Sequence, residues 1–497
     1  MELQTPQPST RAADDPARAS YEAVPYSVNA FAQTQPDRLA TIGRLFGLAA
    51  PDPDRCRVLE LGAASGGNVI PMALGSPTSH FVGIDLSGAQ VADGVRVIRE
   101  LGLKNVELRE MSILDVTPEF GQFDYILAHG VYSWVPTAVQ EKILSICSRN
   151  LSPRGVAYVS YNCYPGWHAR AALREMLWYH TARFSEPAER VRQARALLAF
   201  LAVAMPRADA SYTTLIRQEL MLLMVTPDSY LLHEHLDEVN EPLYFHQFAQ
   251  RAAKHELQYL GEAIVGTMSP AKFGPAVEKT LQQIAPDLLQ MEQYMDFLRN
   301  RMFRQTLLCH EDAKLDHALR PEALRDLYIA SSAKPVKEED EADSTREFET
   351  PAKQKLATRD PMMKSAMLRL AEAWPASVAF KELAGSADDE QRRQLATRLI
   401  NCVVSQIVEF SLTPSKFVVD VSQNPTASPY ARLRARGGGK VTSMRLENVQ
   451  MSDLQRKILA ELDGTKAAAE LVGLVEKDEA EIQQMLGSFA RSALLIG

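Results

Sequence analysis

Residues 57–68, with the sequence RVLELGAASGGN, constrain this chain more than any other stretch. A short apolar run ends near Glu60 and passes directly into a glycine-rich loop. Such runs are typical of buried parallel strands, and glycines let the backbone turn tightly and approach a ligand. A second apolar run, FVGID, ends at Asp85. The order of strand, glycine loop, helix, strand and acid indicates a nucleoside site in an α/β sheet, where the strand-end acid can accept both ribose hydroxyl protons.

The loop itself, residues 62–67, matches the dinucleotide-binding fingerprint only in part. Ala64 stands where that fingerprint has the middle glycine, which lets a pyrophosphate approach the backbone. Glu60 lies just before the loop, and its carboxylate would repel a pyrophosphate but would suit a cation. S-adenosylmethionine carries a sulfonium and an ammonium group and no phosphate. The residues therefore favour S-adenosylmethionine, with a nicotinamide dinucleotide as the alternative.

Length and composition limit the number of domains and the classes of function. A chain of 497 residues is expected to form about two to four domains. The net charge of −8 gives no general attraction to nucleic acid, so nucleic-acid binding is not expected. No apolar run of about 18 residues predicts membrane insertion, and the polar N-terminus has no secretory signal. Five scattered cysteines indicate reduced thiols, so we expect a cytoplasmic protein.

The pattern of apolar residues divides the chain into five parts. Short apolar runs alternate with helical segments up to about residue 165, which predicts a parallel sheet. Helical spacing then dominates, until a charged segment without periodicity predicts an exposed linker. In the C-terminal part, strands are expected at 416–421 and 440–447. The predicted parts are a disordered N-terminus (1–20), an α/β domain (21–185), a helical domain (186–332), the linker (333–355) and a small C-terminal domain (356–497).

Several motifs together resemble one family. They are VPYS (24–27), QTQPDRLA (33–40), VLELGAASGGN (58–68), FVGIDLS (81–87), FDYILAHGVYSWVP (123–136) and AYVSYNCYPGWH (157–168). This set resembles class I S-adenosylmethionine-dependent methyltransferases. More narrowly, it resembles the bacterial group with a methyltransferase regulatory domain, which includes the rickettsial-type outer-membrane-protein lysine methyltransferases. Residues 233–249 and 303–316 resemble the regulatory domain, and the part containing LDGTK (462–466) resembles a winged-helix domain.

The resemblance implies a fold and a way of holding the cofactor. The fold would be a Rossmann-like α/β sheet, then a helical regulatory and dimerisation domain, then a winged-helix-like α+β domain. Asp85 would bind the ribose hydroxyls, and Leu86, Ser112 and Ile113 would surround the adenine, although Leu86 and Ile113 would serve equally in the core. The full cofactor-binding set is Glu60, Gly62, Ala63, Ala64, Gly66, Gly67, Asn68, Asp85, Leu86, Ser112, Ile113 and His129.

Aromatic and polar residues follow the apolar runs FDYILA and GVAYVSY. In an open parallel sheet, ligands bind beyond the carboxyl ends of the strands. Aromatic rings can hold an alkylammonium by cation–π attraction, and a tyrosine or His129 could relay the proton that a lysine acceptor must lose. The same aromatics could instead form a lid over the cofactor, and His129 could be structural. The catalytic candidates are Tyr26, His129, Tyr132, Trp134, Asn162 and Tyr164.

The predicted function is methyl transfer from S-adenosylmethionine. By resemblance, the acceptor would be a lysine of a protein, for example an outer-membrane or surface protein, and the enzyme a homodimer. Two alternatives stay open, namely methylation of a small metabolite and a non-catalytic cofactor-binding regulator. No metal is predicted, because four histidines of the helical region lack the spacing of a metal site: His233, His235, His246 and His255.

Overall fold

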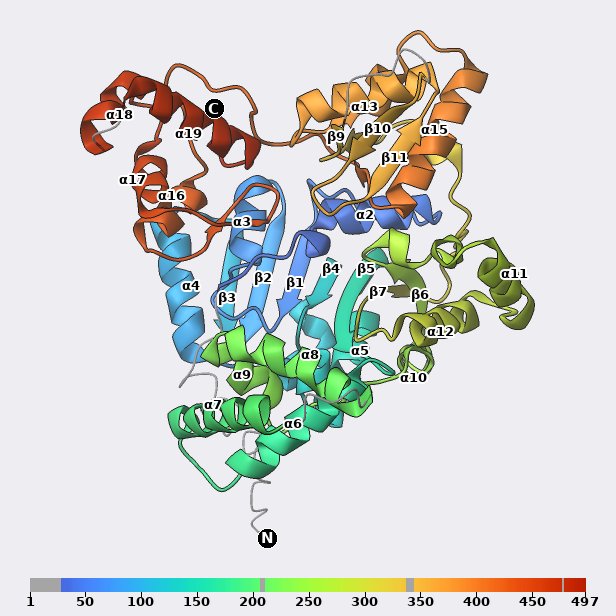
Figure 1. Cartoon of the computed structure of the whole chain (residues 1–497), viewed down its shortest axis with the longest axis vertical. Helices are drawn as coiled ribbons and strands as arrows, with labels where there is room; N and C mark the ends of the chain where they lie inside the picture. Colours follow the sequence, from blue (N-terminus) through green and yellow to red (C-terminus); the bar gives the residue numbers. More distant parts are fainter. Residues whose placement is uncertain (1–27, 206–210, 337–343, 476–477) are drawn as a thin grey trace, which may run out of the picture.

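The computed structural model describes residues 28–205, 211–336, 344–475 and 478–497. The predicted disorder of residues 1–20 and the candidate Tyr26 lie outside these residues. A seven-stranded sheet with the order β3-β2-β1-β4-β5-β7-β6 lies at the centre (Figure 1). Its five parallel strands are β1 (Arg57–Leu61), β2 (His80–Asp85), β3 (Val106–Glu110), β4 (Phe123–Ala128) and β5 (Leu151–Asn162). The predicted Rossmann-like α/β architecture is confirmed.

Alternation along the strands gives the sheet two buried faces. Val58 and Tyr125 belong to one apolar core, and their neighbours Leu59 and Ile126 belong to the other. Successive strand residues point to opposite faces, so both faces must be covered by helices. The first face is covered by α2 (Pro36–Leu45), α3 (Val69–Gly75) and α4 (Gly88–Glu100), and the second by α5 (Thr137–Arg149) and α10 (Phe245–Ala253).

The region predicted to be helical contributes two strands to the sheet. β6 (Leu257–Glu262) and β7 (Phe303–His310) are antiparallel, and β7 pairs with β5 from Ala157 to Asn162. The prediction of a helical domain at 186–332 did not include these two strands. Pairing with a distant strand overrides the local pattern, which single-sequence periodicity does not register. α11 (Pro275–Ile284) and α12 (Leu288–Arg299) lie between the two strands in sequence.

Four helices form a separate bundle after β5. They are α6 (Trp167–Thr181), α7 (Pro187–Ala204), α8 (Ser211–Val225) and α9 (Asp228–His235), and they share an apolar core. Because α6 packs in this core, the structural boundary precedes α6 and does not lie at residue 185. The bundle lies on the side of the sheet toward which the parallel strands point (Figure 1).

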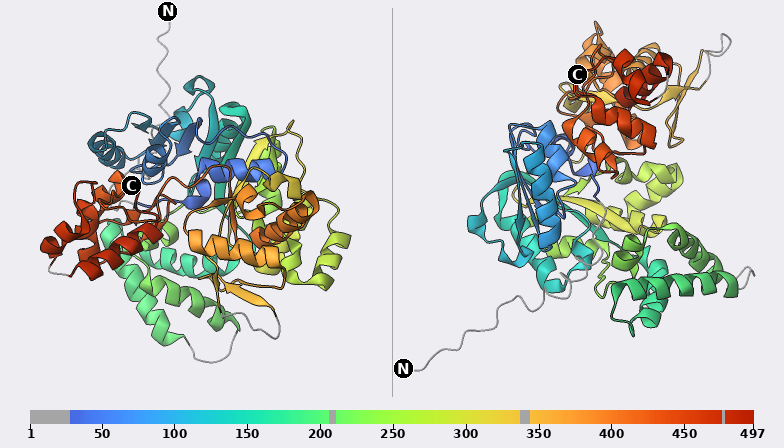
Figure 2. Two further views of the ribbon diagram at one scale, coloured as in Figure 1. Left: turned by 90° about the horizontal axis from the view of Figure 1, so that it is seen from above. Right: turned by 90° about the vertical axis from the view of Figure 1, so that its left-hand side faces the viewer.

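The C-terminal part forms two units, at the opposite end of the molecule from the bundle (Figure 2). In the first, β8 (Tyr328–Ala330), β12 (Val378–Ala379) and β13 (Glu409–Ser411) form a small sheet with α13 (Pro361–Ala373), α14 (Phe380–Ala384) and α15 (Asp389–Val404). The predicted linker 333–355 is not simply a linker. It contributes β9 (Lys334–Pro335) and β10 (Arg346–Glu349), which pair with each other, and β10 also pairs with β11 (Lys355–Thr358). The buried side chain of Phe348 anchors this charged sheet.

The second C-terminal unit has its own apolar core. It contains α16 (Pro429–Arg436), α17 (Asp453–Glu461), α18 (Ala468–Val475), α19 (Glu479–Arg491) and the hairpin of β14 (Val441–Thr442) and β15 (Asn448–Val449). The strand expected at 416–421 is absent, and the one at 440–447 is reduced to β14. In the described part of the chain, no helix is long and apolar enough to cross a membrane.

Candidate active site

The glycine loop turns sharply between β1 and α3. Gly62 and Gly66 both have φ of +74°, a conformation that glycine adopts without strain. The backbone amides of Gly62 and Ala63 donate to the carbonyl oxygen of Ile84 at 2.9 Å, which fastens the loop to the end of β2. Ala64 also has a positive φ, of 48°, and its amide donates to Asp85 Oδ2 at 2.7 Å. The loop and the two strand ends therefore form one rigid cradle.

Glu60 presents an unsatisfied carboxyl oxygen inside this cradle. Its side chain is 3% exposed, and Oε1 accepts a hydrogen bond of 2.8 Å from Asn68 Nδ2. Oε2 is buried and has no partner among the described residues. Burial raises the pKa of Glu60 to about 7, against the lowering effect of the Asn68 bond. A buried, unpaired carboxyl oxygen next to a glycine loop fits a cationic ligand and opposes a phosphate.

Two backbone amides fix the orientation of the Asp85 carboxylate. Oδ2 accepts from Ala64, and Oδ1 accepts from the amide of Ser87 at 2.9 Å. Burial raises the pKa of this carboxyl, while the amide bonds act to lower it. Each carboxylate oxygen can accept a second hydrogen bond, so Asp85 can still accept hydrogen bonds from hydroxyl groups of a ligand.

The remaining cofactor candidates lie around the ends of β2 and β3. Leu86, Ser112 and Ile113 are half-buried, and Ser112 Oγ accepts a 3.3 Å bond from the amide of Leu114. Ile113 also packs against the core of the second sheet face. These side chains border the cradle, and their contacts with a nucleoside stay a prediction.

A segment that the sequence analysis did not place lies against the cradle. The amide of Phe31 donates to Asn68 Oδ1 at 3.0 Å, and Asn68 Nδ2 donates to Thr34 Oγ1 at 3.0 Å. A Cβ atom on Gly67 would lie 2.6 Å from Val28 Cγ1, so only glycine allows this close approach. The only sequence signal for it was the QTQPDRLA motif.

His129, at the end of β4, is held from two sides. Its ring centroid lies 3.8 Å from that of Phe31, with the two rings tilted by 37°, and Nδ1 lies 2.9 Å from the hydroxyl of Tyr158. Burial lowers the pKa of His129 to about 4, so the imidazole is neutral near pH 7 and a weak base. The amide of the following Gly130 donates to Ser160 Oγ at 2.8 Å. This environment favours a positioning role over proton abstraction.

Tyr132 and Trp134 face the interior. They form the 3-10 helix η5 (Tyr132–Trp134), and Tyr132 is fully buried, with its ring 5.3 Å from that of Phe248. Trp134 is buried with its ring 6.0 Å from Trp167. Both pack in the protein, so their placement does not favour the acceptor cage proposed from the sequence.

Asn162 and Tyr164 lie where β5 ends. Asn162 is buried, and its Nδ2 donates to Asn240 Oδ1 at 3.0 Å. Tyr164 is half-buried and stacks on His168 at 4.2 Å, with Tyr244 at 5.4 Å. Tyr164 therefore stays a candidate for contact with an acceptor, and Tyr244 is a neighbour that the sequence analysis missed.

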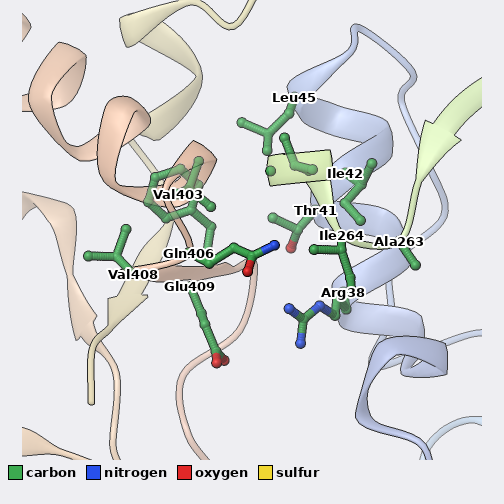
Figure 3. A pocket seen from close by; sticks show the side chains of 13 residues that line it. Arg38, Thr41, Ile42, Leu45, Ala263, Ile264, Val403, Gln406, Val408 and Glu409 are labelled. Carbon is green, nitrogen blue, oxygen red and sulfur yellow. The ribbon is translucent and has the colours of Figure 1, made fainter. Parts of the chain in front are cut away.

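The described structure also contains a cavity of about 220 Å³ away from the donor cradle (Figure 3). Arg38 and Ile42 of α2 line one side, and Val403 and Glu409 of the first C-terminal unit line the other. None of the predicted cofactor residues lines it.

The four histidines do not gather. His246 Nδ1 lies 2.9 Å from Gln293 Oε1 and His255 Nε2 lies 2.8 Å from Glu141 Oε2, while His233 and His235 are buried on α9. Among the residues that the structure describes, no group of three potential ligands could hold a metal ion.

Comparison with known proteins decides the family. Residues 52–201 match a family described as a methyltransferase domain, residues 227–310 one described as a predicted methyltransferase regulatory domain, and residues 423–488 one described as the PKMT C-terminal winged helix domain. The structure of PKMT2 from Rickettsia typhi superposes with a TM-score of 0.86 at 30% identity, covering 95% of this chain and 100% of that one. The chain belongs to the PKMT family of methyltransferases.

Other relatives agree with this assignment. A second PKMT2 structure, in complex with AdoHcy, gives the same TM-score at 29% identity. An uncharacterized protein of Rickettsia prowazekii is 35% identical over 479 residues, which is 92% of this chain and 86% of that protein. This protein is thus an S-adenosylmethionine-dependent methyltransferase, and its regulatory and winged-helix domains are confirmed. The unpaired Glu60 oxygen, the amide-aimed Asp85 and the glycine loop all fit that cofactor.

Proposed function

We propose that this enzyme methylates lysine side chains of a protein acceptor. The observation that carries the proposal is the match to PKMT2 over 95% of the chain, which extends through the regulatory region and both C-terminal units. A metabolite methyltransferase would share the sheet but would have no evident need of these additions. The half-buried Tyr164 at the end of β5 adds a surface suited to an alkylammonium group.

The residues around the glycine loop would bind S-adenosylmethionine, the methyl donor. Glu60 would hold the cationic methionine end, Asp85 would hold the ribose hydroxyls, and Leu86, Ser112 and Ile113 would border the adenine. S-adenosylmethionine supplies a methyl group activated by a sulfonium. Phe31 and His129 would shield the reacting end from water. Methyl transfer itself depends chiefly on the positioning of donor and acceptor.

The acceptor amine must be neutral to attack. Burial against Phe31 and His129 disfavours an ammonium and so favours loss of its proton to solvent before reaction. A neutral His129 with a pKa of about 4 is not needed as the base in this scheme. The amine then displaces the methyl group from sulfur in line, and the proton that the methylated amine carries leaves to water.

Cofactor affinity is expected to rise with pH. In the protein without cofactor, the pKa of Glu60 is about 7. A cationic ligand binds the ionised carboxylate, so protonation of Glu60 competes with cofactor binding. Because about one tenth of this group is ionised at pH 6 and about nine tenths at pH 8, the Kd should fall about tenfold between these values. Calorimetry across this range measures it. The Glu60→Gln variant should bind weakly without this pH dependence, and Glu119→Gln, at a fully exposed site, should behave as wild type.

Label transfer tests the lysine proposal. Enzyme and S-adenosylmethionine with a radiolabelled methyl group are incubated with a bacterial lysate separated into protein and small-molecule fractions. We expect label in protein, released as methyl-lysine on acid hydrolysis. Label confined to small molecules would replace the proposal with metabolite methylation, and cofactor binding without any transfer would favour a regulator.

We propose further that the acceptors include surface or outer-membrane proteins and that they are methylated in the cytoplasm before export. The five cysteines are all free and buried, which suits a reducing compartment. Methyl-lysine in the outer-membrane fraction of expressing cells, absent without the enzyme, supports this step. Its absence there contradicts it.

A homodimer through the helical bundle is also part of the proposal. Large apolar side chains are exposed there, with Val203 88% and Tyr179 85% exposed. Apolar patches of this kind mark association surfaces. The other exposed members include Phe200, Leu215, Met221, Leu222, Met224 and Val225.

Disruption of this patch is expected to give monomers. Phe200→Asp with Met221→Asp places charges in the apolar surface and should halve the mass measured by sedimentation equilibrium. Val277→Asp, an exposed apolar site on α11, serves as the control and should leave the dimer intact. A monomeric wild type at micromolar concentration would contradict the dimer.

A further inference from the structure

A segment of the regulatory region is fastened to the end of β5. Asn240 Oδ1 accepts from Asn162 Nδ2 at 3.0 Å, and the amide of Leu243 donates to the carbonyl of Asn162 at 3.1 Å. The amide of Tyr164 in turn donates to the carbonyl of Leu243, also at 3.1 Å. The amide of Glu241 donates to the carbonyl of Ser133 at 2.8 Å, which ties the same segment to the loop after β4. Residues 240–244 therefore form part of the carboxyl edge where β4 and β5 end.

Glu241 brings a negative charge to this edge. Its two carboxylate oxygens each lie 3.4 Å from Thr137 Oγ1, and the residue is half-exposed. Among the described contacts no lysine or arginine pairs with this carboxylate. The 3.4 Å contacts with the Thr137 hydroxyl are long for hydrogen bonds, so the Glu241 carboxylate can still bind a cation of another molecule.

Tyr244 brings an aromatic ring to the same edge. Its hydroxyl lies 3.2 Å from His168 Nε2, and its ring lies 5.4 Å from that of Tyr164. Tyr164 and Tyr244 are half-buried, and His168 is exposed. The three rings form an accessible cluster made jointly by the loop after β5 and the regulatory region.

The regulatory region also places a side chain near His129. Phe303, the first residue of β7, pairs with Asn162 at the end of β5. Its ring lies 6.3 Å from that of His129, which in turn packs against Phe31. The regulatory region thus places Phe303 beside His129 and residues 240–244 at the end of the same strand, β5.

We propose that Glu241 and Tyr244 recognise the acceptor lysine. Glu241 attracts its ammonium group, and Tyr244, with Tyr164, holds the alkylammonium by cation–π attraction while the acceptor docks. This inference rests on the proposed lysine methylation and assigns half of the acceptor site to the regulatory region. Neither residue touches the cofactor cradle, so both act in substrate recognition and not in donor binding.

Steady-state label transfer with the full-length chain tests the assignment. The probe is the total protein of a heat-denatured bacterial lysate, with methyl-lysine as the measured product. Glu241→Gln is expected to raise the apparent KM for acceptor protein about fivefold, and Tyr244→Leu about tenfold, with kcat at saturation within twofold of wild type. Glu241→Asp should recover most of the loss. The Kd for S-adenosylmethionine and the melting temperature should not change.

Matched controls separate recognition from general damage. Glu119 belongs to the 3-10 helix η4 (Pro118–Phe120), which comes directly before the amino end of β4, whereas the proposed acceptor residues lie at the carboxyl ends of the strands. Glu119→Gln should therefore leave KM unchanged. Tyr328→Leu, a half-buried tyrosine of the C-terminal sheet, should do the same. Equal KM values for wild type, Glu241→Gln and Tyr244→Leu overturn this inference alone. Failure of the wild type to transfer methyl groups to any lysine overturns both this inference and the proposed function.

Discussion

Replacement of Asp85 by alanine is expected to weaken S-adenosylmethionine binding at least about 100-fold. The carboxylate lies at the end of β2 and is fixed by the amides of Ala64 and Ser87. Hydrogen bonds to a charged group contribute about 1.5–3 kcal/mol each, and a factor of 100 corresponds to about 2.7 kcal/mol. Loss of the bonds to the ribose hydroxyls therefore accounts for the expected change. Isothermal calorimetry with the purified protein measures it directly.

Two comparisons make the Asp85 result specific. Asp93→Ala removes an exposed carboxylate from α4 that pairs with Arg96, and it should bind the cofactor as wild type does. Asp85→Asn keeps the shape but loses the charge, and its affinity should fall between those of wild type and Asp85→Ala. A Kd for Asp85→Ala within threefold of wild type, in a protein of unchanged melting temperature, would show that this aspartate does not hold the ribose.

The glycine loop and the two acids near it could be placed from the sequence because their determinants are local. The apolar run, the glycines that need positive φ and the acid at the end of the next run all lie within one β-α-β unit. Local propensity and the fold agree there, as they do in most well-specified elements. Even so, the bond from Asn68 to Glu60 and the segment packed on Gly67 had no sequence signal beyond a motif.

The surroundings of the acceptor candidates could not be predicted, because they depend on contacts between distant segments. Tyr132 follows β4 in sequence, but the short helix η5 turns its ring into the core against Phe248 of the regulatory region. Tyr244 reaches Tyr164 because the preceding Leu243 bonds directly to the backbone of Asn162 and Tyr164 at the end of β5. Periodicity reports which face of an element is apolar, and it does not report which remote element covers that face.

The buried ion cluster of the regulatory region should be the largest single contributor to the stability of this sheet edge. Arg304 is fully buried, and it bonds Glu262 Oε1 at 2.6 Å, Glu292 Oε2 at 2.9 Å and Asp296 Oδ2 at 2.8 Å. Arg301 bonds Glu262 from the other side at 2.8 Å. Removal of one partner from a buried ion pair costs about 3–5 kcal/mol, because the remaining charge stays buried without compensation. Arg304→Met is expected to destabilise the fold by at least this much.

Hydrogen exchange measures this effect better than one melting temperature, because a chain with several domains need not unfold in a single step. Protection should fall in β6, β7 and α12, which carry the cluster, and should persist in the separate core of the second C-terminal unit. Arg320→Met is the control, since its ion pair with Asp316 is exposed and contributes little. Because β7 also supplies Phe303 beside His129, acceptor methylation should fall with this protection while cofactor binding persists. Unchanged protection in Arg304→Met would show that the cluster does not anchor this edge.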